Sequence, residues 1–147
     1  MALNTNNLGI ETINSIEPIV RTGLRFDSVD ANTITARMPL SGNANHNGIM
    51  YAGSLFSLAE CAAGVLFMNR YEPKAIAPIC AGVNIRFRRP ATSDVTVSIT
   101  ISDEKFAQLE QQALEEGKAV IEFAENLEDE NGEVVSVADV KYVLMKL

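Results

Sequence analysis

One long apolar segment constrains the fold of this sequence more than any other feature. Residues 52–70 are mostly small or apolar, and Glu60 is the only charged residue between Ala52 and Asn69. A helix that is apolar almost all round is either buried in a fold or set in a membrane, and this segment approaches the length that crosses a bilayer. Its two glycines, two serines and one carboxylate make a poor membrane span. We therefore expect a buried central helix over residues 52–70 and no membrane span.

The rest of the chain is rich in β-prone segments, several with alternating apolar and polar residues. The pattern predicts an antiparallel sheet of about six strands, over residues 24–29, 33–40, 76–88, 95–101, 119–127 and 134–145. Asn131-Gly132, between the last two strands, is the strongest hairpin signal in the chain. Such a sheet must bury one face, and the 52–70 helix is the element available to cover it.

Two further helices are predicted, one over residues 10–16 that ends shortly before Pro18 and a polar one over residues 106–116. No linker or internal repeat divides the 147 residues. The expectation is an α+β fold in a single domain spanning residues 1–147.

Composition excludes several classes of function. The formal net charge of −7 and the pI of about 4.7 argue against a nucleic-acid partner. His46 is the only histidine, and no cluster of ligands accompanies it, so we expect neither a metal site nor a cofactor. Cys61 and Cys80 form no CxxC pair, and residues 1–13 do not resemble a signal peptide. We expect buried thiols in a reducing, cytoplasmic setting.

Glu60 is the first candidate for a functional residue, because burying a carboxylate without partners is costly. Gly53, Ser57, Glu60 and Gly64 are spaced by 4, 3 and 4 residues, so they share one stripe of the helix. This small, polar stripe leaves room beside the carboxylate for a ligand. The alternative is a solvated carboxylate at the rim of the fold.

The start of the same helix offers a second group. The first backbone N–H groups, at residues 52–54, have no partner within a helix and form a natural cradle for an oxyanion or phosphate. Glu60 lies two turns from Gly53, about 10 Å along the axis. To act on one carbonyl group, Glu60 and the N–H groups must each lie near 3 Å from it. Glu60 can therefore work only with the helix start of a second copy of the chain. The spacing thus hints at an active site shared across a dimer.

The residues around this helix resemble those of a known family. Residues 45–60, NHNGIMYAGSLFSLAE, look like the central-helix motif of hotdog-fold thioesterases, and residues 84–91, NIRFRRPA, are similar to the strand end that follows it. The phrase AGSLF at residues 52–56 is closest to the thioesterase domain found beside some acetyltransferases. The resemblance implies a hotdog fold, hydrolysis of acyl-CoA or acyl carrier protein thioesters, and a homodimer with two sheets side by side. Whether such dimers pair into a tetramer stays open.

The resemblance also implies roles for single residues. Glu60 would be the general base on water or a nucleophile acting through an anhydride. The N–H groups of Ala52 and Gly53 would polarise the thioester carbonyl. The remaining expected contacts are Asn45, which would orient water or substrate, and Arg88 and Arg89, which would meet the CoA phosphates. Ser57, one turn from Glu60, could hydrogen-bond the carboxylate or the water, or simply pack.

The sequence departs from the family motif at Tyr51-Ala52, which replace the usual His-Gly. Ala52 keeps its N–H, whereas Tyr51 changes the wall of the site. Two alternatives therefore stay open. One is an acyl-CoA-binding or sensing domain without turnover. The other is a hydratase or dehydratase that uses His46, which could equally brace its loop, touch substrate or stay exposed to solvent.

Overall fold

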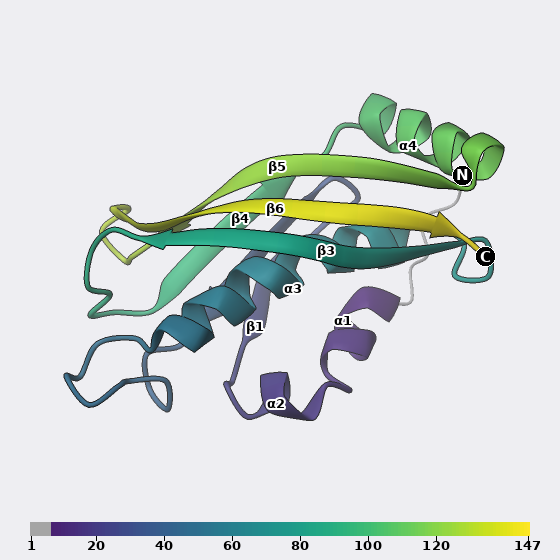
Figure 1. The fold of residues 1–147 in the computed structure, drawn as a ribbon. Coiled ribbons are helices and arrows are strands. Elements are labelled where there is room, and N and C mark those ends of the chain that lie inside the picture. The colour runs from purple at the N-terminus through teal and green to yellow at the C-terminus, as the bar shows by residue number, and fades with distance from the viewer. Residues whose placement is uncertain (1–6) are drawn as a thin grey trace.

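The computed structural model describes residues 7–147, and these form one six-stranded antiparallel sheet that lies against a long helix, α3 (Figure 1). The strands are β1 Arg25–Val29, β2 Thr33–Met38, β3 Ile76–Phe87, β4 Val95–Thr100, β5 Lys118–Glu128 and β6 Val134–Lys146. Their order in the sheet is β1-β2-β4-β5-β6-β3, so β1 and β3 are the two edges. The predicted six strands and the placement of the helix after the second strand are confirmed.

Helix α3 spans Ala52–Arg70, the predicted range. By length and composition it could cross a membrane, but 61% of its apolar window is buried inside the fold. The sheet covers one side of α3, and helix α1, Leu8–Ile13, packs on another. Gly9 makes that contact possible, because a Cβ there would lie 2.6 Å from the Val65 carbonyl oxygen. Cover from two directions explains why α3 is apolar almost all round.

Two predictions about helices need correction. The first helix spans Leu8–Ile13 and not residues 10–16, and Pro18 does not end it but lies in the first turn of a second helix, α2, Glu17–Val20. A proline fits there because its missing N–H would have no helical partner and its fixed φ suits a helix. Helix α4, Asp103–Glu116, begins three residues earlier than predicted, because the Ser102 hydroxyl accepts a hydrogen bond from the Lys105 N–H and caps the first turn.

Among residues 7–147, no strand pairs with one side of strand β3. Its twelve residues pair with β6 only, and Ile79 and Phe87 on β3 are 49% and 51% exposed. Phe56 on the neighbouring helix α3 is 41% exposed. The unpaired edge strand and the neighbouring helix therefore each carry exposed apolar side chains.

Candidate functional site

Glu60 lies near the middle of α3 with its side chain half-buried. Its Oε2 accepts a hydrogen bond from the Cys61 thiol, at an S–O distance of 3.1 Å. Its backbone carbonyl accepts a hydrogen bond of 2.6 Å from the Tyr142 hydroxyl on β6. The same hydroxyl lies 3.1 Å from the position of a Cβ on Gly64. The stripe of small residues on α3 predicted room for a ligand beside Glu60. At Gly64 the Tyr142 hydroxyl fills that room.

Weak acids surround the Glu60 carboxylate. Burial, and then the charge of Glu60, raises the pKa of the Cys61 thiol, the Cys80 thiol on β3 and the Tyr142 phenol. Each of these groups therefore keeps its proton near neutral pH. Glu60 thus lies among neutral side chains that can donate hydrogen bonds but cannot neutralise its charge.

A second carboxyl belongs to this cluster and was missed in the sequence. Glu125 lies on β5 and is only 2% exposed, and neither of its side-chain oxygens has a hydrogen-bond partner within the described part of the chain. Burial, with a further contribution from Glu60, raises the pKa of Glu125 to about 8. The sequence contains a signal that could have identified Glu125 as buried. Glu125 occupies an alternate position of β5 that points to the same buried face as Ile121 and Leu127.

The start of α3 presents two backbone donors. The Tyr51 carbonyl accepts hydrogen bonds from the N–H groups of Ser54 and Leu55, and no described side chain caps the helix. The N–H groups of Ala52 and Gly53 donate to no acceptor among residues 7–147. The sequence indicated three N–H groups, at residues 52–54, as an oxyanion cradle, and this is wrong for Ser54, whose N–H bonds the Tyr51 carbonyl.

A buried asparagine, Asn43, holds this helix start in place. Its carbonyl oxygen accepts the Tyr51 N–H at 2.8 Å, and its Oδ1 accepts the Ser54 hydroxyl at 2.9 Å. Its Nδ2 group donates to the carbonyls of Thr22 and Pro39. The sequence analysis overlooked Asn43, because its position in a turn-rich segment gave no sign that it is buried.

The exposed Tyr51 ring lies beside Gly53. A Cβ on Gly53 would lie 2.5 Å from Cε1 of that ring, so only glycine accommodates Tyr51 in this position. Gly53 was expected to allow a ligand to approach the helix start. In the structure it allows the close approach of Tyr51, which forms one wall of the start.

Four of the candidate residues meet in one hollow of about 340 Å³ next to the helix start. Asn45, Ala52, Arg88 and Arg89 all line it. Asn45 also shapes its own loop, because its Oδ1 accepts hydrogen bonds from backbone N–H groups at residues 47 and 49. Arg89 is exposed and lies 3.7 Å from a Glu133 carboxylate oxygen.

The other candidates lie outside that hollow. Glu60 does not line it, in agreement with the two helical turns between Glu60 and the helix start. The Ser57 hydroxyl donates to the Gly53 carbonyl at 2.9 Å, so it bonds its own helix and not Glu60. His46 is exposed, with its Nε2 atom 3.2 Å from Asn47 Nδ2. One chain therefore holds the two halves of the expected site in separate places.

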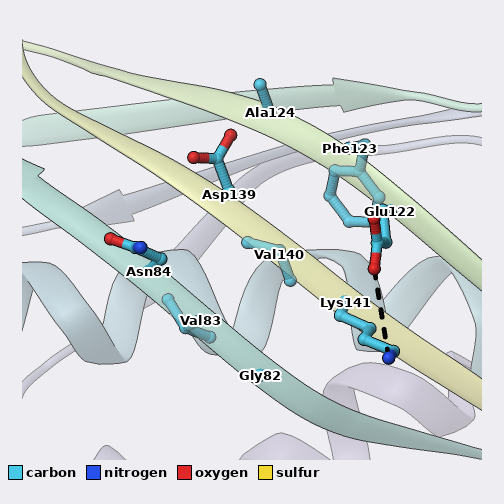
Figure 2. A pocket seen from close by; sticks show the side chains of 9 residues that line it. All are labelled: Gly82, Val83, Asn84, Glu122, Phe123, Ala124, Asp139, Val140 and Lys141. Carbon is cyan, nitrogen blue, oxygen red and sulfur yellow. Dashed lines mark ion pairs between the residues drawn. The ribbon is translucent and has the colours of Figure 1, made fainter.

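A further hollow, of about 560 Å³, lies over β3, β6 and β5 (Figure 2). Polar side chains stand on this side of the sheet, and Lys141 lies 4.0 Å from Glu122 across neighbouring strands. Asp139 forms an ion pair of 3.0 Å with Arg86. None of the candidate residues lines this hollow, so we assign no chemistry to it.

Comparison with known proteins gives the context for this arrangement. Residues 12–144 match a family described as a domain of unknown function, DUF4442. A protein of unknown function from Pseudomonas aeruginosa, termed a probable thioesterase, is 39% identical over 100% of this chain and 99% of its own, with a TM-score of 0.91. No curated protein matches the sequence.

More distant structures share the fold. A protein of unknown function from Chlorobaculum tepidum has a TM-score of 0.81 at 19% identity, covering 93% of this chain and 91% of its own. A thioesterase from Haemophilus influenzae has a TM-score of 0.72 at 17% identity, covering 100% of this chain and 96% of its own. The hotdog fold, with its sheet around a central helix, is confirmed, as is the resemblance to thioesterases that residues 45–60 suggested.

Proposed function

The chain belongs to the DUF4442 family, and from this premise we propose that it is a homodimeric hydrolase of acyl thioesters, either acyl-CoA or acyl carrier protein derivatives. The observation that carries the proposal is the position of Glu60. It is a half-buried carboxylate on an otherwise apolar helix, next to the uncovered edge of the molecule and two turns from an unoccupied pair of N–H donors. Glu60 and the N–H pair can act on one substrate only when Glu60 comes from one chain and the N–H pair from another.

The dimer we propose forms along β3. A long, uncovered edge strand is a template for pairing with another chain, and the exposed Ile79, Phe87 and Phe56 would be buried by such pairing. A two-fold axis perpendicular to the sheet would set two β3 strands antiparallel and make one continuous sheet. It would also set the two α3 helices antiparallel, so that the start of each approaches Glu60 of the other.

In this arrangement Glu60 acts on water. It takes one proton from the water molecule while the water oxygen adds to the thioester carbonyl carbon. The negative charge that develops on the carbonyl oxygen is held by the N–H groups of Ala52 and Gly53 of the second chain. The carbon–sulfur bond then breaks, and the leaving thiolate takes the proton back from Glu60. The products are one carboxylic acid and one free thiol.

Glu60 can also attack the carbonyl itself, which gives an enzyme-bound anhydride and releases the thiol before water enters. Single-turnover hydrolysis in ¹⁸O-labelled water separates the two routes. The nucleophilic route leaves label in the Glu60 carboxylate after water opens the anhydride at that carboxyl, whereas the general-base route puts all the label into the released acid.

The substrate's charged end would lie near the helix start. Arg88 and Arg89 line the hollow there with Asn45, and guanidinium groups bind phosphates through paired hydrogen bonds. Tyr51 would form the wall of the entrance, with His46 on the neighbouring loop. The free thiols of Cys61 and Cys80 are what a reducing compartment predicts, and we place the protein in the cytoplasm.

The test is steady-state hydrolysis of a panel of acyl-CoA esters, followed through release of the thiol. We expect Glu60→Gln and Glu60→Ala to lose about 10²–10⁴ in kcat, the usual cost of removing one general base. Glu72→Gln, which changes an exposed carboxyl just beyond the same helix, is the matched control and should keep full activity. Equal turnover by the wild type and both Glu60 variants would refute the proposal.

One observation favours a second candidate, an acyl-CoA-binding or sensing domain without turnover. The Tyr51 ring lies beside Gly53, where a bound carbonyl would approach. Calorimetric titration with a non-hydrolysable acyl-CoA ether, alongside the thiol-release assay, distinguishes the two functions. Tight binding without thiol release supports the sensing domain, and rapid turnover rejects it.

A further inference from the structure

Tyr142 connects the sheet to the helix residue on which the proposed chemistry depends. It lies on β6 and is 3% exposed, and its hydroxyl donates a hydrogen bond of 2.6 Å to the backbone carbonyl of Glu60. A buried tyrosine hydroxyl usually finds a hydrogen-bond partner, and many acceptors could serve. Here the acceptor is the main chain of the residue that we propose as the base, so one bond joins β6 to α3 at that residue.

Both elements are shaped for this contact. A Cβ on Gly64 would lie 3.1 Å from the Tyr142 hydroxyl oxygen and 3.8 Å from its Cε1 atom, so glycine leaves the space that the hydroxyl occupies. The tyrosine ring packs against Phe67 of α3 and Phe123 of β5, with ring centroids 5.2 and 6.4 Å apart. Packing against both a helix and a strand holds the ring, and with it the hydroxyl, at the Glu60 carbonyl.

Apolar packing alone holds this part of α3 weakly against rotation. Between Leu58 and Val65 the buried positions carry only small side chains, at Ala59, Cys61, Ala62, Ala63 and Gly64. Small side chains interlock less with a facing surface than large ones do. A side-chain carboxylate lies about 6 Å from the helix axis, so a rotation of about 10° moves it by about 1 Å. A misplacement of that size can cost about 10²-fold in rate.

We propose that Tyr142 is a positioning residue for hydrolysis, whose bond to the Glu60 carbonyl fixes the rotation of α3 and so places the Glu60 carboxylate against the water that it activates. This inference rests on the proposed function of Glu60. Tyr142 does not line the hollow at the helix start, and its hydroxyl is bound to the main chain. It therefore acts through Glu60 and not on the substrate.

Tyr142→Phe removes the hydroxyl and keeps the ring. We expect kcat to fall about 10- to 100-fold, with KM for acyl-CoA within about twofold of the wild type, because the lost interaction serves the reaction and not substrate binding. A merely structural hydroxyl would leave kcat of the folded protein unchanged.

Tyr71→Phe is the matched control. Tyr71 is 2% exposed, its ring also lies beside Phe67, and its hydroxyl donates a bond of 3.0 Å to a backbone carbonyl, that of Phe106. Each variant loses one buried hydrogen bond, so each should lower Tm by about 2–4 °C. Only Tyr142→Phe should lower kcat. A kcat that is equal in the two variants would overturn the proposal.

Gly64→Ala tests the same contact from the helix side. Its Cβ would push the hydroxyl away, so kcat should fall as it does in Tyr142→Phe. In the Tyr142→Phe background the hydroxyl is absent, and adding Gly64→Ala should lower kcat by less than about a further twofold. Losses that multiply in the double variant would show two independent effects and would overturn the proposal.

Carbon-13 NMR of protein labelled at the glutamate carboxyls reads the position of Glu60 without turnover. The loss of one resonance in Glu60→Gln assigns Glu60. Tyr142→Phe should move that resonance and Tyr71→Phe should not, whereas a resonance that Tyr142→Phe leaves in place would overturn the proposal. If the wild type releases no thiol but Tyr142→Phe alone moves the resonance, hydrolysis is rejected and the positioning of Glu60 by Tyr142 is retained.

Discussion

Replacing Glu125 with glutamine changes how the stability of this protein depends on pH. In the unfolded chain the carboxyl ionises near its ordinary pKa of 4.5, whereas in the folded protein burial, with a contribution from Glu60, raises that pKa to about 8. Between these two values the folded state holds one more proton than the unfolded state. By linkage, the protonated Glu125 contributes stability to the folded state. This contribution is fully present below about pH 4.5 and is lost as the pH rises through about 8.

The size of the effect follows from the same two values. A displacement from 4.5 to about 8, at about 1.4 kcal/mol per pH unit, corresponds to a loss of about 5 kcal/mol in the free energy of unfolding. That is comparable to the whole stability of many small domains, about 5–15 kcal/mol. Glutamine carries no proton in this range, so Glu125→Gln lacks the dependence. The carboxyls common to both proteins cancel in the difference.

Urea unfolding of both proteins, followed by circular dichroism at matched concentration, measures this difference. We expect the stability of the wild type relative to Glu125→Gln to fall by about 1.4 kcal/mol per pH unit between about pH 5 and 8 and to level off above that. Glu122→Gln, an exposed carboxyl on the same strand, should follow the wild type. Parallel curves for the wild type and Glu125→Gln would show that Glu125 ionises normally and would refute the reasoning.

Three further outcomes are expected. Phe87→Asp should place a charge in the proposed β3 interface, giving a monomer in light scattering and loss of turnover together; an active monomer would contradict the shared site. Arg88→Ala and Arg89→Ala should each raise KM for acyl-CoA about tenfold without changing kcat, and should leave an acyl-pantetheine substrate, which lacks the nucleotide phosphates, unaffected. Gly53→Ala should turn the exposed Tyr51 ring away from the new Cβ at a cost below about 1 kcal/mol in thermal unfolding, and a larger cost that a Tyr51→Ala background removes would show that the ring is fixed.

The sequence predicted the fold well because its main signals are local. An apolar run without a polar face specifies a buried helix, and α3 has the predicted bounds of residues 52–70. Alternation specifies strands, and Asn131-Gly132 lies in the turn between β5 and β6. The errors arose at helix ends, where Pro18 and Ser102 each start a helix. A proline or serine can begin a helix or follow the end of one, and the residue type alone does not decide between these roles.

The candidate site was only partly predictable, because proximity across the sheet is not local. The sequence identified Glu60 and the N–H groups at residues 52–53 from one helix. It did not find Glu125, which is brought toward Glu60 only by the packing of α3 on the sheet. Gly64 was interpreted as room for a ligand because the residue that fills the space, Tyr142, lies 78 positions away in the sequence.

Three features of the chain oppose the rules of stable packing. Glu60 puts a charge on an apolar helix, and Glu125 puts a carboxyl in the buried register of β5. The third, the unpaired β3 strand, carries Cys80, which lies within the electrostatic influence of both carboxyls. Since a leucine at 125 and a paired edge would each give a more stable monomer, stability within one chain does not explain these features. A site completed by a second chain accounts for two of them, because it needs a charged base and an edge where the partner binds.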